Sequence, residues 1–251
     1  MGNALRLHRR KEIKLSDRET ETQRRYYTAT ADTYNDMHGH QADPEHMLSL
    51  AFMASCIPLL GVQSVLDVGS GTGRALFHMK EHHPDIRVTG IEPVAALRRI
   101  GHKSGLTDEE LLDGDATNLQ FEDGAYDLVC EFGVLHHLKR PELAVAQMLR
   151  VSRIAVFLSD SNNFGQGSFP SRAVKQTIRA LGLWRFADRI KTRGKGYTIS
   201  EGDGLAYSYS VFNNFEQIQE QCKVVHLLNT RDGQINPYRT ASHVALLGVK
   251  A

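Results

Sequence analysis

The 251-residue sequence lacks several features that mark particular classes of protein. Its three cysteines, Cys56, Cys130 and Cys222, are scattered and odd in number, which argues against a disulfide framework or a zinc site. Lysine and arginine outnumber aspartate and glutamate by only 30 to 29, so the basic excess typical of nucleic-acid-binding proteins is missing. No apolar run has the roughly 18 residues of a membrane span, and the N-terminus has no apolar signal core. We therefore expect a cytoplasmic protein with reduced thiols, no nucleic-acid partner and no membrane span.

The chain does contain a regular alternation of short apolar runs and amphipathic segments. The expected strands are residues 64–69, 86–93, 125–133 and 153–160, with a further short strand inside residues 110–117. The expected helices are residues 43–60, 74–84, 94–105 and 140–152. Strands that alternate with helices predict a parallel sheet that is covered by helices on both faces. Residues 1–24, by contrast, are rich in charge and poor in large apolar groups, so we expect a flexible N-terminal arm there.

The alternation stops after residue 160. Residues 161–215 hold two glycine-rich segments around a helical stretch, and so long a connection between strands is typical of a lid over a binding site. Two strand-like runs, residues 222–230 and 243–251, follow without a helix between them and should pair antiparallel. The expected fold is therefore a Rossmann-like α/β domain over residues 25–251. Its seven-stranded sheet is mostly parallel with an antiparallel terminal strand, and residues 161–215 form a substrate-lid insertion.

The segment VLDVGSGTG places Gly69, Gly71 and Gly73 between an apolar strand and a helix. A turn without side chains lets ligand atoms approach the backbone, and the helix N-terminus offers unpaired N–H groups. Glu92 lies 19 positions after Gly73, where a carboxylate can accept hydrogen bonds from both hydroxyls of a ribose. The pattern predicts a nucleoside-containing cofactor, which leaves a dinucleotide and S-adenosylmethionine as the two candidates.

The spacing of the glycines separates these two cofactors. The dinucleotide fingerprint is G-x-G-x-x-G, whereas this sequence reads G-S-G-T-G. Asp67, two residues before the first glycine, is placed to orient a cationic amine near the turn. A cofactor with an ammonium and a sulfonium group, and without a pyrophosphate, therefore fits better than NAD.

Four segments resemble motifs of the class I S-adenosylmethionine-dependent methyltransferases. LDVGSGTG is similar to the first motif of that family, GIEP to the acidic end of its second strand, GDATNLQFEDGAYDLV to its adenine-binding loop, and EFGVLHHL to its fourth motif. The resemblance covers residues 26–160 and, more weakly, the terminal strand pair. It implies the seven-stranded fold and S-adenosyl-L-methionine as cofactor, whereas the small-molecule acceptor is inferred from the absence of a basic excess and of an RNA-binding appendage.

The resemblance also implies a set of cofactor contacts. The methionine and ribose portions are expected against the glycine turn, the amino group near Asp67, the ribose on Glu92 and the adenine near Asp115, although a loop cap is an alternative for Asp115. The implied cofactor-binding residues are Tyr34, Asp67, Gly69, Gly71, Gly73, Glu92, Pro93, Asp115, Ala116, Glu131 and Phe132.

Candidate residues for the acceptor follow the fourth strand. His136 and His137 lie at the carboxyl edge of the predicted sheet, and a neutral imidazole suits a general base near neutral pH. His136 is the first candidate for a base or a substrate contact and His137 the second; packing or helix capping is the alternative for both. The candidate substrate-binding residues are Tyr26, Tyr197, Tyr207 and Tyr209. The other histidines lack the spacing of a metal site, so no metal is expected.

The predicted activity is methylation of oxygen or nitrogen on a small molecule, such as a sugar or a secondary metabolite. The segment after the fourth strand reads EFGV rather than Asn-Pro-Pro-Tyr or Asp-Pro-Pro-Tyr, which argues against enzymes that modify amides or base amines. The alternatives are carbon methylation, a non-catalytic binding subunit that keeps the cofactor fold, and a nicotinamide-dependent oxidoreductase. A homodimer stays open.

Overall fold

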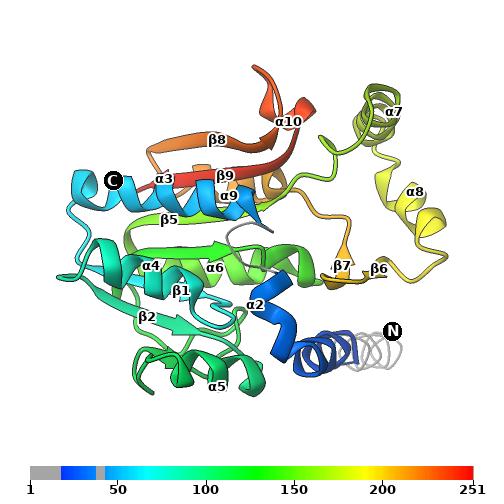
Figure 1. The fold of residues 1–251 in the computed structure, drawn as a ribbon. Helices are drawn as coiled ribbons and strands as arrows, with labels where there is room; N and C mark the ends of the chain where they lie inside the picture. Colours follow the sequence, from blue (N-terminus) through cyan, green and yellow to red (C-terminus); the bar gives the residue numbers. More distant parts are fainter. Residues whose placement is uncertain (1–17, 38–42, 251) are drawn as a thin grey trace, which may run out of the picture.

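A computed structural model describes residues 18–37 and 43–250 and contains a seven-stranded sheet (Figure 1). The strands are β1 (Ser64–Val68), β2 (Arg87–Ile91), β3 (Leu111–Leu112), β4 (Tyr126–Phe132), β5 (Ser152–Ser161), β8 (Val224–Asp232) and β9 (Ala241–Val249), in the order β3-β2-β1-β4-β5-β9-β8. The pairs from β3 to β5 are parallel, and β9 is antiparallel to both β5 and β8. The expected mostly parallel sheet with an antiparallel terminal strand is confirmed.

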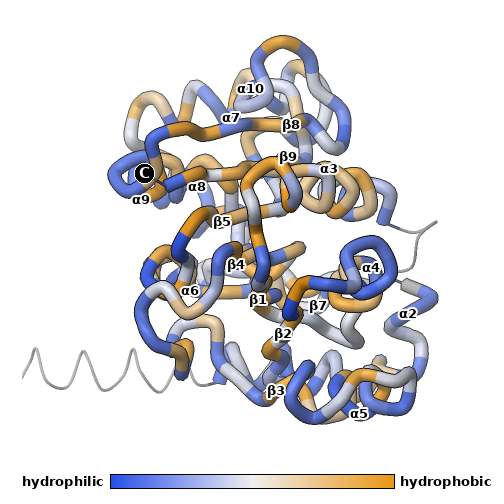
Figure 2. Tube along the Cα trace, turned by 90° about the vertical axis from the view of Figure 1, so that its left-hand side faces the viewer, coloured by the Kyte–Doolittle hydropathy of each residue, from blue (hydrophilic) through white to orange (hydrophobic). Residues whose placement is uncertain are grey.

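Helices pack on both faces of this sheet, as the alternation predicts. They are α3 (Pro44–Leu60), α4 (Arg74–His82) and α5 (Ala95–Lys103), and later in the chain α6 (Pro141–Val151), α9 (Phe215–Gln219) and α10 (Pro237–Thr240). Val65 and Phe157 belong to a buried cluster with α3 and α4, whereas Leu66 and Val156 belong to one with α6 and α9. Figure 2 shows the stacked strands with α3 and α4 on one side and α6 and α9 on the other. Side chains alternate across a strand, so apolar runs such as SVLDV supply both clusters.

The order of the strands decides where a ligand binds. β1 lies between β2 and β4, so the chain turns in opposite directions from the carboxyl ends of β1 and β4. In open α/β sheets, ligands bind in the crevice at such a switch point. The third strand is short, as expected, because only Leu111 and Leu112 pair with β2. Asp115 is therefore in a loop at the same edge.

Residues 161–215 form a separate group of elements beyond β5. They contain α7 (Phe169–Ala180), α8 (Trp184–Lys191), the antiparallel pair β6 (Tyr197–Ser200) and β7 (Gly204–Tyr207), and the 3-10 helix η3 (Val211–Asn214). The single helical stretch expected here is divided at Gly182, where φ is +72°. Figure 1 shows α7 and α8 projecting away from the sheet, while β7 returns toward its carboxyl edge.

The N-terminal helix, residues 18–29, packs on this insertion. Gln23 Oε1 accepts a hydrogen bond from Leu205 N at 2.6 Å, and the Tyr207 hydroxyl donates to Glu19 Oε2 at 2.9 Å. Residues 18–24 are thus helical and in contact with the rest of the protein, which differs from the flexible arm expected over residues 1–24. Residues 1–17 lie outside the described residues. The 3-10 helix η1 (Ala31–Thr33) and α2 (Tyr34–Met37) follow the N-terminal helix.

Two further expectations concern the whole chain. The three cysteines are free thiols, and Cys130 and Cys222 are buried. Across residues 18–37 and 43–250, none of the helices combines the length and the apolar character that crossing a bilayer requires.

Candidate functional site

The turn after β1 has the left-handed backbone that its glycines permit. The angle φ is +77° at Gly69, +58° at Gly71 and +94° at Gly73. A Cβ atom at Gly71 would lie 2.5 Å from the hydroxyl oxygen of Tyr34, and one at Gly73 would collide with the side chain of Leu106. Gly71 therefore gives room to Tyr34, whereas Gly73 allows Leu106 to pack closely at the start of α4. A Cβ atom at Gly69 would collide with Val134 Cγ2, so each of the three glycines makes room for a different side chain.

Two buried carboxylates stand beside this turn. Glu92 Oε2 accepts a hydrogen bond from Gly71 N at 3.0 Å, and its Oε1 accepts one from Val94 N at 2.8 Å. Burial raises the pKa of Glu92 to about 7 and the pKa of Asp67 to about 6. Buried acids with raised pKa values are favourably placed for ligands that donate hydrogen bonds or carry positive charge.

The turn and the ends of β2 and β4 border a cavity of about 610 Å³, here called the turn cavity. The predicted cofactor residues that line it are Tyr34, Gly69, Glu92, Pro93, Asp115, Ala116 and Phe132. Asp67 lines an adjoining cavity of about 770 Å³ together with Tyr34, Gly69 and Phe132. Asp115 Oδ1 also accepts a hydrogen bond from Thr117 N at 2.8 Å, so this carboxylate caps its own loop while its side chain borders the cavity.

Glu131 has a different position from the other predicted cofactor residues. Its side chain is fully buried and accepts hydrogen bonds from Val134 N at 2.9 Å and from Ser159 N at 3.0 Å. The carboxylate thus links the end of β4 to β5 and is not among the residues that line the turn cavity. Any contact of Glu131 with a ligand in that cavity has to come from its backbone.

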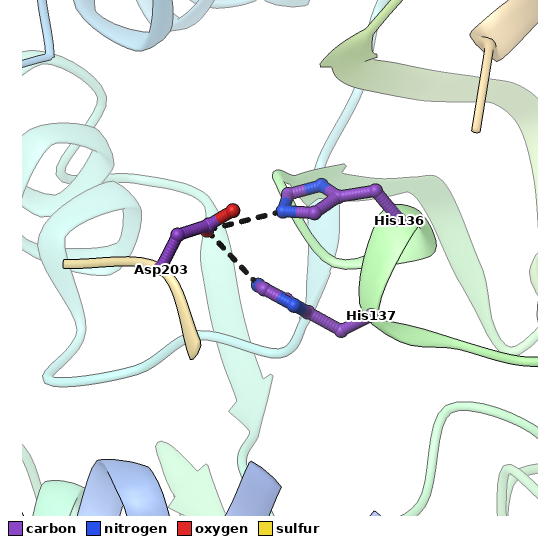
Figure 3. Close-up of side chains that lie close together, drawn as sticks. All are labelled: His136, His137 and Asp203. Carbon is purple, nitrogen blue, oxygen red and sulfur yellow. Dashed lines mark hydrogen bonds and ion pairs between the residues drawn. The ribbon is translucent and has the colours of Figure 1, made fainter. Parts of the chain in front are cut away.

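His136 and His137 lie on the 3-10 helix η2 (Leu135–His137) and converge on one carboxylate of the insertion. His136 Nε2 is 3.2 Å from Asp203 Oδ1, and His137 Nε2 is 3.5 Å from the same oxygen (Figure 3). On the far side of its ring, His136 Nδ1 is 2.8 Å from Asp160 Oδ1. Asp203 therefore connects the loop between β6 and β7 to the carboxyl edge of the sheet.

The two imidazoles differ in charge. Burial by itself lowers the pKa of His136, but the carboxylates of Asp160 and Asp203 outweigh it and raise that pKa well above its ordinary value. Burial, together with the neighbouring charge of His136, lowers the pKa of His137 to about 4. His137 Nδ1 is 2.7 Å from the carbonyl oxygen of Leu205, and its Nε2 is 3.0 Å from the Tyr27 hydroxyl. At neutral pH the pair is thus one imidazolium beside one neutral imidazole.

The same three side chains are close enough together to hold a metal ion. One ligand atom each of His136, His137 and Asp203 lies within 4.8 Å of the others, the one such group among the described residues. Their ring nitrogens already have partners in Asp160, Leu205, Tyr27 and Asp203 itself. The hydrogen bonds and ion pairs therefore account for this arrangement without a cation.

A second cavity, of about 750 Å³, lies between the sheet edge and the insertion and is here called the insertion cavity. Tyr27, Tyr34, Phe132, Gly133, His137 and Tyr207 line both this cavity and the turn cavity. Of the predicted substrate residues, Tyr207 and Tyr209 line the insertion cavity, whereas Tyr26 and Tyr197 do not. The Tyr26 hydroxyl instead accepts a hydrogen bond from Gly202 N at 2.7 Å, and Tyr197 packs on Tyr207 in the β6–β7 pair.

Sequence reasoning missed several residues of this site. Asp160 follows the rule that polar residues at the carboxyl ends of parallel strands form sites, so its place in β5 was a usable signal. Asp203 stands between two glycines in GDGLAY. This pattern predicts a tight loop, but it does not predict which part of the protein the loop contacts. Tyr27 gave only the signal of an aromatic at helical spacing. Glu45, Asn163 and His243, which also line the insertion cavity, gave none.

Comparisons with known proteins agree with this geometry. The family model described as "Methyltransferase domain" matches residues 66–157. Norajmaline N-methyltransferase of Rauvolfia serpentina is 30% identical over 122 residues, which is 45% of this chain and 41% of that protein. Phosphatidylethanolamine N-methyltransferase of Cereibacter sphaeroides is 33% identical over 119 residues, 45% of this chain and 57% of that protein. The matches span 41%, 32% and 49% of the length of three curated relatives.

Solved structures share the fold over almost the whole chain. Magnesium protoporphyrin IX methyltransferase of Synechocystis PCC 6803, solved with bound S-adenosylhomocysteine, has a TM-score of 0.58 and 14% identity and covers 93% of this chain and 99% of its own. An S-adenosylmethionine-dependent methyltransferase of Thermotoga maritima has a TM-score of 0.55 and 14% identity, with 90% and 98% covered. Residues 66–157 therefore resemble a methyltransferase domain, and the chain shares the fold of these solved methyltransferases.

Proposed function

We propose that the protein is an S-adenosylmethionine-dependent methyltransferase that acts on oxygen or nitrogen of a small molecule. The observation that carries this proposal is that the two cavities have lining residues in common, among them Tyr27, Tyr34, Gly133 and His137. The residues that line both cavities are here called the shared wall. A methyl donor in the turn cavity and an acceptor in the insertion cavity meet at this wall. Transfer from a sulfonium needs such an in-line approach with water excluded.

The residues of the turn cavity fit this cofactor. Glu92 is placed to accept hydrogen bonds from ribose hydroxyls, and the loop of Asp115 and Ala116 is placed beside the adenine. Asp67, in the adjoining cavity, is placed near the amino group of the methionine portion. When bound, the cofactor supplies an electrophilic methyl group on a positively charged sulfur, and the nearby carboxylates favour that charge.

The neutral imidazole of His137 is the group best suited to receive the acceptor's proton. It lies on the shared wall, its Nε2 faces the Tyr27 hydroxyl at 3.0 Å, and burial keeps it neutral at neutral pH by lowering its pKa to about 4. So weak a base takes a proton from the strongly acidic oxonium that forms on an oxygen acceptor, but not from an ordinary ammonium. His136 already carries a proton between two carboxylates, so its proposed role is to hold Asp203 and thereby the insertion in place. Bound S-adenosylmethionine would supply its methyl group to the acceptor's oxygen or nitrogen and leave as S-adenosylhomocysteine, and His137 would take up the proton that an oxygen acceptor releases.

The insertion, residues 161–215, is proposed to be the lid of this site within a single domain over residues 25–251. Thr198, Ser200, Asp203 and Tyr207 from β6, β7 and their loop all line the insertion cavity. The Asp203 interactions with both histidines hold this loop over the sheet edge. A lid of this kind excludes water from the reacting groups.

Calorimetric titration of the full chain tests the proposed function. We expect S-adenosylhomocysteine, the product form of the cofactor, to bind with a micromolar or lower dissociation constant, and NAD to show no measurable binding. Binding of NAD in place of S-adenosylhomocysteine would instead support a nicotinamide-dependent oxidoreductase. Methyl transfer from labelled S-adenosylmethionine to a small-molecule extract distinguishes an enzyme from a non-catalytic binding subunit.

Cofactor affinity is expected to depend on pH through Glu92. This carboxylate accepts hydroxyl hydrogen bonds best when it is ionised, and its pKa is about 7 because of burial. Protonation as the pH falls through 7 should therefore weaken binding, by about tenfold between pH 8 and pH 6. Titrations of S-adenosylhomocysteine across this range measure the effect. The variant Glu92→Gln should bind more weakly with a flatter profile, and a flat profile for the unmodified protein contradicts the role of Glu92.

A further inference from the structure

Three buried polar atoms without a hydrogen-bond partner belong to side chains of the insertion cavity. They are Glu45 Oε2, Asn163 Nδ2 and His243 Nε2, and the described residues contain five such side-chain atoms. Glu45 is 8% exposed, Asn163 6% and His243 7%. A buried polar group almost always has a partner, because leaving it unpaired is costly. Three of the five unpaired atoms thus belong to side chains that line the same cavity, and a ligand of that cavity would explain why they have no partner among the described residues.

Other contacts hold these three residues in place. Glu45 Oε1 accepts a hydrogen bond from Arg231 Nη1 at 2.9 Å, and the two side chains form an ion pair. His243 Nδ1 is 2.5 Å from the Thr230 hydroxyl oxygen, and Asn163 N donates to the Tyr209 carbonyl at 3.0 Å. Each residue thus has an anchored portion together with a polar atom that no residue of the described chain uses.

The unpaired atoms together match a hydroxyl group in particular. The Glu45 carboxylate oxygen can only accept a hydrogen bond, and the Asn163 amide nitrogen can only donate one. Burial lowers the pKa of His243 to about 4, so its neutral ring nitrogen accepts or donates according to its tautomer. A hydroxyl group does both, whereas an ammonium group only donates and an apolar ring does neither.

His243 also lies near a residue that lines both cavities. The ring of His46 packs on that of His243 with centroids 4.6 Å apart. A Cβ atom added at Gly133 would lie 3.0 Å from His46 Nε2, and Gly133 lines both cavities. His243 is therefore separated from Gly133 by the single ring of His46.

We propose that Glu45, Asn163 and His243 form a subsite for a polyhydroxylated, sugar-like portion of the acceptor. This inference rests on the proposed function and narrows its substrate class. The matched relatives include norajmaline and ajmaline N-methyltransferases, whose acceptor names differ from this class. An acceptor without hydroxyl groups leaves three buried polar atoms unpaired, and sites built for hydroxyls discriminate strongly against analogues that lack them.

The first test is binding to the full chain saturated with S-adenosylhomocysteine. The probes are the methyl glycosides of glucose, galactose, mannose and N-acetylglucosamine, with tryptamine as a flat, apolar amine. Saturation-transfer NMR and calorimetry should detect at least one glycoside and no tryptamine. Binding of tryptamine alone, or of no probe at all, overturns the proposal.

The second test compares two single variants. Asn163→Leu removes the unpaired donor from the cavity and should weaken glycoside binding at least about tenfold, while S-adenosylhomocysteine binding stays the same. Asp188→Asn is the matched control, because Asp188 Oδ1 is also buried and unpaired but its side chain is not among those lining the cavity. The control should bind glycoside normally. Equal losses in both variants, or no loss in Asn163→Leu, contradict the subsite.

Thermal unfolding separates a binding role from a structural one. Replacement of an unpaired buried amide by leucine should leave the melting temperature unchanged or raise it, since no hydrogen bond is lost. A clear decrease would show that the amide supports the fold and would contradict the proposal. Glu45→Gln, which keeps the side-chain shape, provides a second binding variant with the same expected loss. Failure of S-adenosylhomocysteine to bind contradicts the proposed function, whereas loss of glycoside binding alone contradicts only the subsite.

Discussion

Replacing Gly71 by valine is expected to weaken S-adenosylhomocysteine binding by at least about 100-fold, equivalent to about 2.7 kcal/mol. A Cβ atom at this position would lie 2.5 Å from the Tyr34 hydroxyl and 3.0 Å from two ring carbons. Tyr34 must then move, although it lines both cavities. The strained turn also displaces Gly71 N from Glu92. Calorimetric titration measures the loss.

The control for this experiment is Gly105→Val. Gly105 has a comparable left-handed backbone with φ of +112°, but a Cβ atom there meets no heavy atom within 4 Å. Both variants carry backbone strain of about 1–2 kcal/mol, and only Gly71→Val also crowds the site. Circular dichroism should show that both fold. An unchanged affinity in Gly71→Val, or an equal loss of affinity in Gly105→Val, would show that the turn is not part of the cofactor site.

The second large effect is expected for His137→Ala. If this imidazole receives the acceptor's proton, its removal should lower kcat by about 100-fold or more. The dissociation constant of S-adenosylhomocysteine should change by less than about threefold, since the cofactor relies on other groups. Measured kcat, KM and cofactor affinity in the same variant separate these effects. A variant with full turnover would exclude a proton-transfer role for His137.

His136→Ala serves as the comparison, because its expected defect is in folding. Removal of this imidazolium leaves Asp160, which is 0% exposed, without its charged partner. Breaking one side of a buried ion pair typically costs about 3–5 kcal/mol, so the melting temperature should fall well below that of His137→Ala. Equal stability of the two variants would contradict the assigned charges.

The buried carboxylate of Glu92 lowers the folding stability of the protein when it is ionised. Burial raises the pKa of Glu92 from its ordinary value to about 7, so the folded state holds this proton more tightly than the unfolded chain does. Stability from this group is therefore present below the unfolded pKa and is lost as the pH rises through 7. A ligand that binds the ionised group restores the stability. Binding sites commonly retain such unfavourable groups.

Much of the fold followed from local patterns. The apolar run SVLDV and the glycines after it predict a buried strand that ends in a turn, and β1 ends at Val68 as expected. Pro141 predicts the start of α6, which begins at that residue. The third strand is short, as expected. The helical stretch of the insertion was less predictable, because Gly182 divides it into α7 and α8.

Local patterns in the sequence predict much of this protein. Hydrophobic periodicity predicts the sheet and its covering helices, and the turn glycines with Glu92 predict the cofactor side of the site. Each of these patterns depends on residues near one another in the chain. The acceptor side depends on separations that no local pattern encodes. Asp203 meets His136 across 67 positions, and Arg231 meets Glu45 across 186. Which polar atoms find a partner, and which stay unpaired for a ligand, is settled only when distant segments pack together and exclude water.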